Sequence, residues 1–173
     1  MEKTRCPGCM KLKASGAVCE HCGFDENTQN ASHQLQIGTV LNEQYRIGKV
    51  LGQGGFGITY LGWDLYLDIP VAIKEYFPDR AVMRESAVSP EVVSYTGTVG
   101  ERFRSNKERF MREAKMLAKF SDVAEIVQVK NFFMENNTAY IVMEYVDGIT
   151  LKQYVAAKGG KLTVAETLSL LSL

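Results

Sequence analysis

The chain has 173 residues, 46% of them hydrophobic and 23% charged, which is enough for one ordinary globular domain and a small appendage. Basic and acidic residues number 20 each, and this balance excludes the cation excess typical of general nucleic-acid or membrane-surface binders. No segment reaches the roughly 18 apolar residues of a membrane-spanning helix, and the start lacks the apolar core of a secretion signal. We expect a cytoplasmic protein without a membrane segment up to residue 173; an anchor in a longer parent stays open.

All four cysteines fall near the start of the chain, as two CxxC pairs separated by nine residues. The four positions are Cys6, Cys9, Cys19 and Cys22. Two residues between paired thiols let one tight turn aim both sulfurs at the same point, and Pro7, Gly8 and Gly23 supply suitable backbone angles. Two facing pairs form a Cys₄ tetrahedron, the coordination of structural Zn²⁺. Because such a site has no open position, we expect a zinc ribbon that stabilises or docks and does not catalyse.

Two other uses of the cysteines compete with zinc. Two disulfides would need an oxidising compartment, which no other feature indicates. A redox CxxC would not require two copies and would lie beside a βαβ pattern, which is absent. Zinc is the favoured interpretation, and metal binding is expected to fold residues 1–24, which are too few to bury a useful core. His21, between two predicted ligands, is interpreted as a solvated turn residue.

The next segment, residues 25–39, is interpreted as a flexible linker. Residues 25–36 are polar and almost without apolar anchors. His33 within it is interpreted as a solvated residue.

A glycine-rich loop lies between two strand-like runs, residues 45–51 and 58–63. The loop is Gly52-Gln53-Gly54-Gly55-Phe56-Gly57, a GxGxxG pattern shared with dinucleotide-binding folds. In those folds the pattern opens a helix, whereas Ile58, Thr59 and Tyr60 favour a continued strand. A glycine-rich hairpin can close its backbone amides over a polyphosphate. The alternative is a hairpin without a ligand, although such a turn needs two special residues and not four glycines.

A third strand, residues 69–76, contains Val71-Ala72-Ile73-Lys74. Behind the glycine-rich loop, this order resembles the protein kinase family, which combines GxGxxGxV with VAIK. The resemblance implies that Lys74 binds the α- and β-phosphates of ATP and pairs with a glutamate on the following helix. An ordinary solvent-facing lysine is the alternative.

The expected helix is residues 101–120, where Phe103, Phe110, Ala114 and Leu117 recur at spacings of seven, four and three. Glu113 should project from the buried side, and a buried carboxylate needs a cation. With the family resemblance, Lys74 and Glu113 are the predicted catalytic pair. A solvated i,i+4 pair between Glu113 and a neighbour is the alternative.

Two further runs, residues 126–134 and 138–146, complete five strands. The resemblance makes Met143 the gatekeeper beside the adenine, and the Glu144 carbonyl and Val146 N–H its hydrogen-bonding partners. The predicted nucleotide-binding residues are Leu51, Gly52, Gln53, Gly54, Gly55, Phe56, Gly57, Thr59, Ala72, Lys74, Met143, Glu144 and Val146.

Three features depart from the family pattern. Thr59 stands where valine usually roofs the adenine. Residues 77–100 lengthen the connection between Lys74 and Glu113, and we expect a mobile loop that gates the helix. No HRD or DFG motif occurs, so the aspartate base and the Mg²⁺ ligands lie outside this chain.

The predicted fold is α+β. It comprises a zinc ribbon (1–24), the linker (25–39), a kinase-like N-lobe of five antiparallel strands and one helix (40–146), and the start of a C-lobe (147–173). We expect a fragment, because the last helix is cut off.

The resemblance extends to bacterial eukaryote-type serine/threonine kinases, through residues 56–61 and 73–78. It implies the ATP-binding part of an enzyme that transfers the γ-phosphoryl of Mg·ATP to Ser/Thr hydroxyls of protein substrates, with negligible turnover by this chain alone. The alternative is a non-catalytic nucleotide-binding or scaffold module whose ribbon recruits a protein partner. A zinc-ribbon nucleic-acid binder ranks last, because the basic excess lies on the predicted helix.

Overall fold

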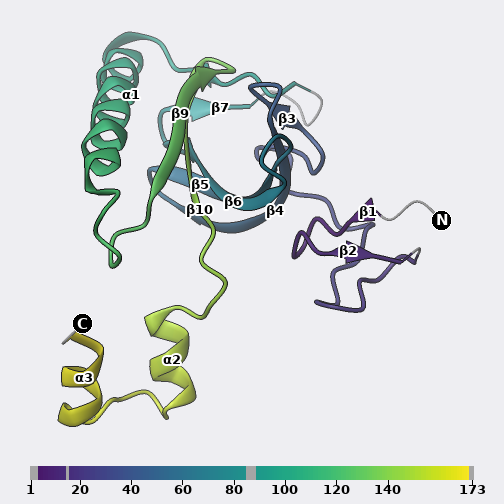
Figure 1. Ribbon diagram of the computed structural model, residues 1–173. Helices are drawn as coiled ribbons and strands as arrows, with labels where there is room; N and C mark the ends of the chain where they lie inside the picture. Colours follow the sequence, from purple (N-terminus) through teal and green to yellow (C-terminus); the bar gives the residue numbers. More distant parts are fainter. Residues whose placement is uncertain (1–3, 15, 85–88, 172–173) are drawn as a thin grey trace.

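A strongly curved antiparallel sheet forms the centre of the computed structural model, which describes residues 4–14, 16–84 and 89–171 (Figure 1). Its strand order is β3-β4-β5-β6-β10-β9. The strands are β3 (Val40–Leu41), β4 (Tyr45–Gly54), β5 (Gly57–Asp64), β6 (Ile69–Tyr76), β9 (Val129–Glu135) and β10 (Thr138–Glu144). The five predicted strands are confirmed, and the short β3 is an additional edge strand that the sequence analysis did not predict.

Turn residues explain where the strands reverse. Asn136 and Asn137 both have positive φ, 51° and 58°, and they join β9 to β10 as a two-residue hairpin. Asparagine tolerates this conformation, and such turns match the twist of the paired strands. Between β5 and β6, the Asp64 carboxylate accepts hydrogen bonds from the backbone N–H groups of Tyr66 and Leu67, 3.0 Å each. Local chemistry therefore fixes both connections.

One long helix, α1 (Gly97–Leu117), packs beside the sheet and continues into a short 3₁₀ turn at Ala118–Phe120. It starts four residues before the predicted start, so it takes up part of the expected loop. Phe103, Phe110 and Ala114 are its apolar contacts to the sheet, and the Tyr76 ring lies 5.4 Å from each phenylalanine ring. The helical spacing thus predicted three of its four positions correctly, whereas Leu117, in the last turn of α1, is 40% exposed.

The hydrophobic core lies inside the curved sheet and under α1. Its buried members come from the strands, the helix and the two segments that flank them. They are Leu35, Leu41, Tyr45, Ile47, Ile58, Tyr60, Val71, Ile73, Tyr76, Phe77, Val82, Val92, Phe103, Phe110, Ala114, Ala139, Tyr140, Ile141 and Val142.

The segment that we interpreted as a flexible linker packs against the sheet. Leu35 is 1% exposed, and its backbone N–H donates to the Tyr60 hydroxyl at 3.0 Å. Asn30 Nδ2 donates to the carbonyls of Leu35 and Gly48. The interpretation was wrong because one leucine, buried in the core of the curved sheet, is enough to dock this polar segment. The backbone groups of the segment form hydrogen bonds with Tyr60 and Asn30.

The loop expected to be mobile, residues 77–100, is anchored in its described parts. It contains a two-stranded hairpin of β7 (Val82–Met83) and β8 (Val93–Ser94). Phe77, Val82 and Val92 are buried in the main core. The prediction that this loop gates α1 remains a prediction, and residues 85–88 lie outside the described residues.

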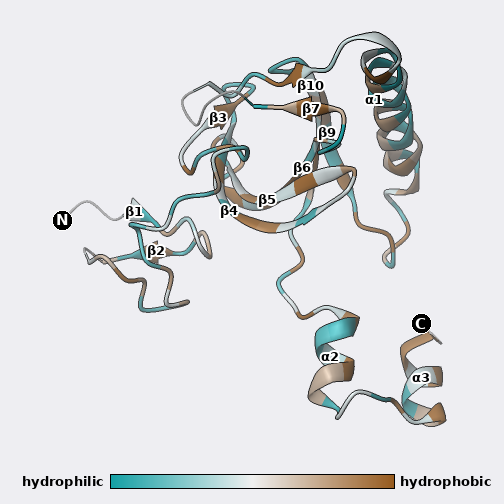
Figure 2. Cartoon of the chain, turned by 180° about the vertical axis from the view of Figure 1, so that it is seen from behind, coloured by the Kyte–Doolittle hydropathy of each residue, from teal (hydrophilic) through white to brown (hydrophobic). Residues whose placement is uncertain are grey.

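The two ends of the chain flank the sheet differently. The ribbon, with strands β1 (Thr4–Arg5) and β2 (Leu12–Lys13), lies on the side of the sheet away from α1 (Figure 1). Helices α2 (Leu151–Ala157) and α3 (Val164–Leu171) lie apart from the sheet, and neither has a buried residue among those described (Figure 2). No helix in the described ranges is long and apolar enough to span a membrane.

Candidate nucleotide and metal sites

The glycine-rich loop is the turn of the β4–β5 hairpin. Gly52 pairs with Thr59, Gln53 with Ile58 and Gly54 with Gly57, so the chain runs from strand to strand without entering a helix. Phe56 at the tip is 80% exposed. This geometry confirms the sequence argument that separated the loop from a dinucleotide-binding fingerprint.

At three of the four glycines in this loop, neither packing nor backbone conformation within the chain requires glycine. A Cβ atom on Gly52, Gly54 or Gly55 would meet nothing within 4 Å, and none of the three has a positive φ. Gly57 differs, because a Cβ there would overlap the carbonyl oxygen of Glu75. Glycines that neither packing nor backbone angle requires leave open space over the loop, which lets a ligand approach its amides closely.

Strand register brings the predicted adenine and phosphate residues to one face of the sheet. Thr59 is paired with Lys74 across β5–β6, and Ala72 with Met143 across β6–β10. Directly opposed residues of antiparallel strands point to the same face, and residues two apart share it. Val146, two residues beyond the end of β10, is 65% exposed. The sheet therefore gathers residues that are up to 84 positions apart in the chain.

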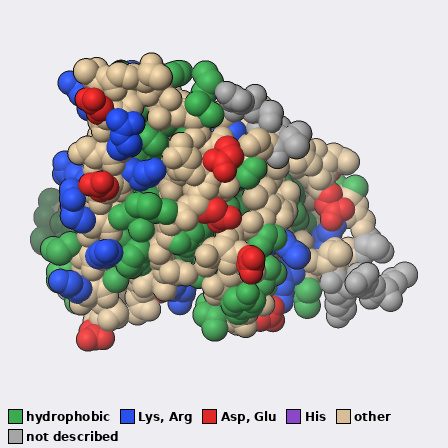
Figure 3. Space-filling view, turned by 90° about the horizontal axis from the view of Figure 1, so that it is seen from above, with side chains coloured by type: hydrophobic (Ala, Val, Ile, Leu, Met, Phe, Trp, Pro, Cys, Tyr) green, Lys and Arg blue, Asp and Glu red, His purple; other side chains and the backbone are tan. Residues whose placement is uncertain are grey.

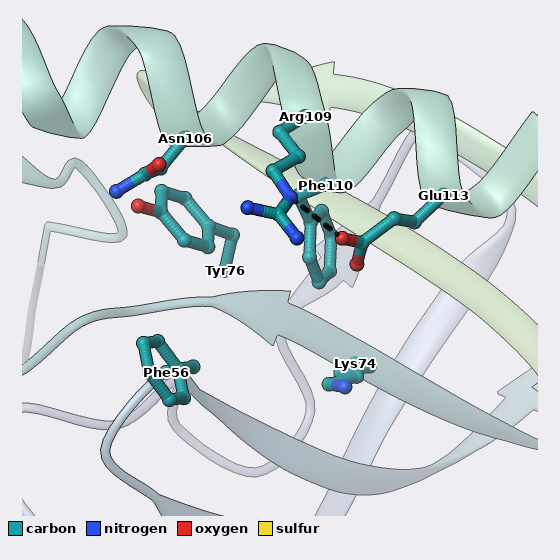
Figure 4. Close-up of a pocket in the computed structure, with 7 residues that line it drawn as sticks. All are labelled: Phe56, Lys74, Tyr76, Asn106, Arg109, Phe110 and Glu113. Carbon is teal, nitrogen blue, oxygen red and sulfur yellow. Dashed lines mark hydrogen bonds and ion pairs between the residues drawn. The ribbon is translucent and has the colours of Figure 1, made fainter.

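A cavity of about 470 Å³ opens between this face and α1 (Figure 4). Lys74 of β6 and Glu113 of α1 face it from opposite walls, with the Phe110 ring between the two elements (Figure 4). The remaining lining residues are Phe56, Tyr76, Asn106 and Arg109. Lys74 Nζ lies 5.8 Å from the centre of the Phe110 ring, within the range of a cation–π contact.

The predicted ion pair between Lys74 and Glu113 is not formed, although both residues are in the described part of the chain. Glu113 instead accepts a hydrogen bond from Arg109 Nε at 3.1 Å, and the Glu113 side chain is 59% exposed. Glu113 lies on the flank of the buried stripe of α1, because it is three residues after Phe110 and one before Ala114. From that flank it reaches Arg109 one turn away more easily than it reaches across the cavity.

A buried polar cluster, which the sequence analysis missed, follows directly after Lys74. Glu75 is fully buried and forms an ion pair with Arg84, whose side chain is 1% exposed. The hydroxyls of Tyr60 and Tyr140 donate to the Glu75 carboxylate at 2.7 and 3.1 Å. Burial raises the pKa of Glu75 and the Arg84 guanidinium acts in the opposite direction. The alternation of β6 could have indicated that Glu75 points inward, but nothing in the sequence identified Arg84 as its partner.

Other lining residues were also missed. Tyr76 is two positions after Lys74 and therefore shares its face of β6, so the alternation of the strand was a usable signal. Burial raises the pKa of Tyr76, and a hydrogen bond from Asn106 acts against this rise. Arg109 is one helical turn before Glu113, and this i,i+4 spacing was a usable sequence signal that Arg109 lies at the site.

The four cysteines converge on one point. Their sulfurs all lie within 4.8 Å of one another, and all four thiols are free. The Cys6–Cys22 and Cys9–Cys19 sulfur distances are 3.7 and 3.9 Å. Sulfurs held at 2.3 Å by a tetrahedral zinc ion would be about 3.8 Å apart. The arrangement therefore fits a Cys₄ metal centre, and the backbone N–H of Gly8 additionally donates to the Cys6 sulfur at 3.3 Å.

The protonation of these thiols depends on their surroundings. Burial raises the pKa of Cys6 to about 12. Burial also acts to raise the pKa of Cys19, but the backbone N–H groups of His21 and Cys22 outweigh it and lower this pKa to about 6. A divalent cation would stabilise all four thiolates, which is the chemistry that this donor set supplies. His21 is not part of the cluster, since its ring nitrogen lies 3.2 Å from the Leu12 carbonyl.

The first cysteine knuckle is docked on the sheet. The Pro7 carbonyl accepts a hydrogen bond from the Lys49 N–H at 3.0 Å, and Met10 is buried against Leu61, Trp63 and Tyr145. A Cβ on Gly48 would overlap both the Met10 methyl group and the Pro7 carbonyl. The ribbon thus contacts the sheet and the residue between Glu144 and Val146.

Positive side chains are concentrated on α1, although the ribbon also carries Arg5, Lys11 and Lys13. In Figure 3 most of the lysine and arginine side chains lie on the side of the molecule where Figure 1 shows α1. In the ribbon, Lys13 is buried and pairs with Glu26 at 2.7 Å.

Comparison with known protein families gives one match, which covers most of the chain. Residues 45–171 match the protein kinase domain. This span contains the glycine-rich loop, Lys74, α1 and β10, and it begins after the cysteines.

Individual relatives agree with this match. The chain is 34% identical to the serine/threonine-protein kinase PrkC of Bacillus subtilis over 72% of its own length, but it covers 16% of that protein. It is 35% identical to serine/threonine-protein kinase C of Synechocystis over 69% of its length, covering 20% of that protein. Among solved structures, "PpkA-294 apo form" has a TM-score of 0.69 and 34% identity, covering 78% of this chain and 46% of that one.

Proposed function

The chain belongs to the protein kinase family, and from this premise we propose that it is the nucleotide-binding part of a bacterial serine/threonine protein kinase. Such an enzyme transfers the γ-phosphoryl of Mg·ATP to Ser or Thr hydroxyls of protein substrates. The chain spans a fifth or less of the two named kinases from Bacillus and Synechocystis, so the activity of the whole protein is part of the proposal.

The observation that carries the proposal is the position of Lys74 under the glycine-rich hairpin. Lys74 is opposite Thr59, two residues after the end of the loop, and it faces the same cavity as Glu113. In this arrangement the amides of residues 52–57 cover the phosphates, Lys74 neutralises their charge, and the backbone of Glu144 and Val146 holds the adenine. Ala72, Thr59 and Met143 form the apolar walls around the base.

Glu113 has a part in this proposal that requires a change of partner. When phosphates bring negative charge to Lys74, a carboxylate that holds the ammonium group in place becomes favourable. The exposed bond between Arg109 and Glu113 costs little to break, because solvent competes for both groups. We therefore expect Glu113 to pair with Lys74 in the nucleotide complex.

Mg²⁺ and the catalytic base are supplied from outside these residues. The chain has no HRD or DFG motif, so it binds nucleotide without transferring phosphate on its own. The cysteine cluster holds a structural Zn²⁺ ion in a reducing, cytoplasmic compartment, where free thiols persist.

Nucleotide binding by the chain tests this function directly. Titration with a fluorescent ATP analogue is expected to give saturable binding that unlabelled ATP displaces, and Lys74→Met is expected to weaken it at least tenfold. Lys130→Met is the matched control, because Lys130 is also an exposed strand lysine but lies on β9. Equal binding by the two variants, or no binding by the wild-type chain, would contradict the proposal. Autophosphorylation by the wild-type chain that Lys74→Met abolishes would contradict the expected inactivity.

A further inference from the structure

Residues 30–36, here called the strap, run alongside β4 towards the glycine-rich loop. Asn30 Nδ2 donates to the Gly48 carbonyl at 3.1 Å. Further along, His33 and Gln34 reach the side chain of Gln53, five residues after Gly48 on the same strand. The strap therefore bridges the base of β4 and the loop at its end.

The contact to the loop consists of two hydrogen bonds to one atom. Gln34 Nε2 donates to Gln53 Oε1 at 2.8 Å, and His33 Nε2 lies 3.0 Å from the same oxygen. A carbonyl oxygen only accepts, so His33 Nε2 carries the hydrogen in this arrangement. Gln53 lies between two glycines of the loop, and its side chain supplies the acceptor that the neighbouring glycines lack.

The strap itself is held by buried groups, which makes it a fixed support. Leu35 is in the main core and bonds to Tyr60. The His33 carbonyl accepts from Arg84, the residue that pairs with buried Glu75. The centre of the His33 ring lies 6.1 Å from the centre of the Phe77 ring, and this contact also orients the His33 side chain.

Phe77 completes the support from the other side of the loop. Its backbone N–H donates to the Phe56 carbonyl at 3.3 Å, at the tip of the hairpin. The Phe77 ring packs under the Arg84 guanidinium, whose carbon lies 5.2 Å from the ring centre. Two ends of the loop, Gln53 and Phe56, are therefore tied to the same group of anchored residues.

We propose that the strap is a positioning element for the glycine-rich loop, acting through His33 and Gln34 on Gln53. Glycine-rich backbone loses much conformational freedom when it is ordered over a ligand. A loop that is restrained beforehand loses less on binding, so the strap favours nucleotide affinity. This consequence for binding rests on the proposed function, whereas the restraint of the loop does not.

The test is a double-mutant cycle read by hydrogen exchange in the nucleotide-free chain. The strap variant is His33→Phe with Gln34→Met, which keeps the ring near Phe77 and removes both donors. The loop variant is Gln53→Leu, which removes the acceptor. Each is expected to raise exchange of the amides of residues 52–57 about fivefold, since two exposed hydrogen bonds are lost, and the combined variant is expected to match either one.

Locality separates positioning from a general loss of structure. The melting temperature and the exchange of buried β5 and β6 amides should not change, and Ser32→Ala, an exposed neighbour in the strap, should leave loop exchange as in the wild type. Unchanged loop exchange in the strap variant, or effects that multiply in the combined variant, would overturn the proposal.

Nucleotide affinity is measured on the same variants with the fluorescent ATP analogue. The strap variant is expected to bind two- to fivefold more weakly. An unchanged affinity despite faster loop exchange would refute the link to binding. If the wild-type chain bound no nucleotide, the proposed function would fail, while the exchange cycle would still decide whether the strap positions the loop.

Discussion

The ribbon, predicted as residues 1–24 and described over 4–14 and 16–24, and the curved sheet that follows it differ in the apolar side chains they bury. The sheet and α1 enclose a continuous apolar core, to which every long strand contributes. The buried apolar side chains described in the ribbon are Cys6, Met10 and Cys19, and Met10 is buried against the sheet rather than within the ribbon. The comparison shows that one chain can combine a region with its own apolar core and a region whose buried side chains are mainly thiols and a contact to its neighbour.

Metal removal is expected to have the largest effect, because it should unfold the ribbon and leave the sheet folded. Structural zinc contributes roughly 10 kcal/mol or more to the folding of comparable small sites. We expect one zinc ion per chain, and Cys19→Ser or a strong chelator should remove it and abolish exchange protection in the ribbon. The strands of the sheet should remain protected, because their core contains no thiol ligand. Elemental analysis and hydrogen exchange measure both effects, and a fully protected ribbon in the metal-free chain would show that zinc is not required.

The buried ion pair between Glu75 and Arg84 tests the stability of the sheet. Glu75→Ala leaves the buried Arg84 without its carboxylate, and removal of one partner of a buried pair costs about 3–5 kcal/mol. We expect a loss of this size in the free energy of unfolding, measured by urea denaturation. Glu75→Leu combined with Arg84→Met should recover part of it, since no charge then remains buried. A double variant that is as unstable as the sum of the single variants would contradict this account.

Docking of the ribbon is tested at Gly48. Gly48→Val places a side chain where the Met10 methyl and the Pro7 carbonyl now lie. We expect the free energy of unfolding to fall by about 1–3 kcal/mol, as for other overpacked sites, and exchange of the Lys49 amide to rise while zinc stays bound. Gly16→Ala is the matched control, since the nearest atom to a Cβ there is 4.0 Å away. Equal stability of the two variants would argue that the ribbon does not dock through Gly48.

The smallest effect is expected on the surface of α1. Arg109→Ala removes an exposed i,i+4 partner of Glu113, and such pairs contribute about 0.3–0.5 kcal/mol. The change in unfolding free energy should stay within this range. Arg102→Ala, at another exposed position of α1, is the control. A loss above about 1 kcal/mol would mean that Arg109 supports the cavity wall in a way that its exposure does not indicate.

Much of the N-lobe could be predicted because its signals are local. Alternating and β-rich runs indicated the five long strands, and Phe103, Phe110 and Ala114 indicated the buried face of α1. The predicted metal ligands converge because CxxC turns impose their geometry within a few residues. The glycine pattern and VAIK indicated the family, which the match over residues 45–171 confirms.

The errors arose where a residue's partner is distant or where two partners compete. Leu35 appeared to be one apolar residue in a polar segment, yet the curvature of the sheet leaves it a buried position. Arg84 had no sequence feature that connected it with Glu75. For Glu113 the sequence allowed both Lys74 and Arg109, and helix geometry favours the nearer arginine in this structure.

The sequence by itself determined the kinase-like order of strands and helix, the placement of Lys74 behind a glycine-rich loop, and the four thiols of a candidate metal centre, because each depends on the spacing of neighbouring residues. Only the tertiary structure decided that the strap and the ribbon pack on the sheet, that Glu75 is paired with Arg84, and that Glu113 bonds to Arg109. Those outcomes depend on surfaces that exist only after the sheet has curved and brought remote segments together, so that burial and competition between partners select among the contacts that the sequence permits.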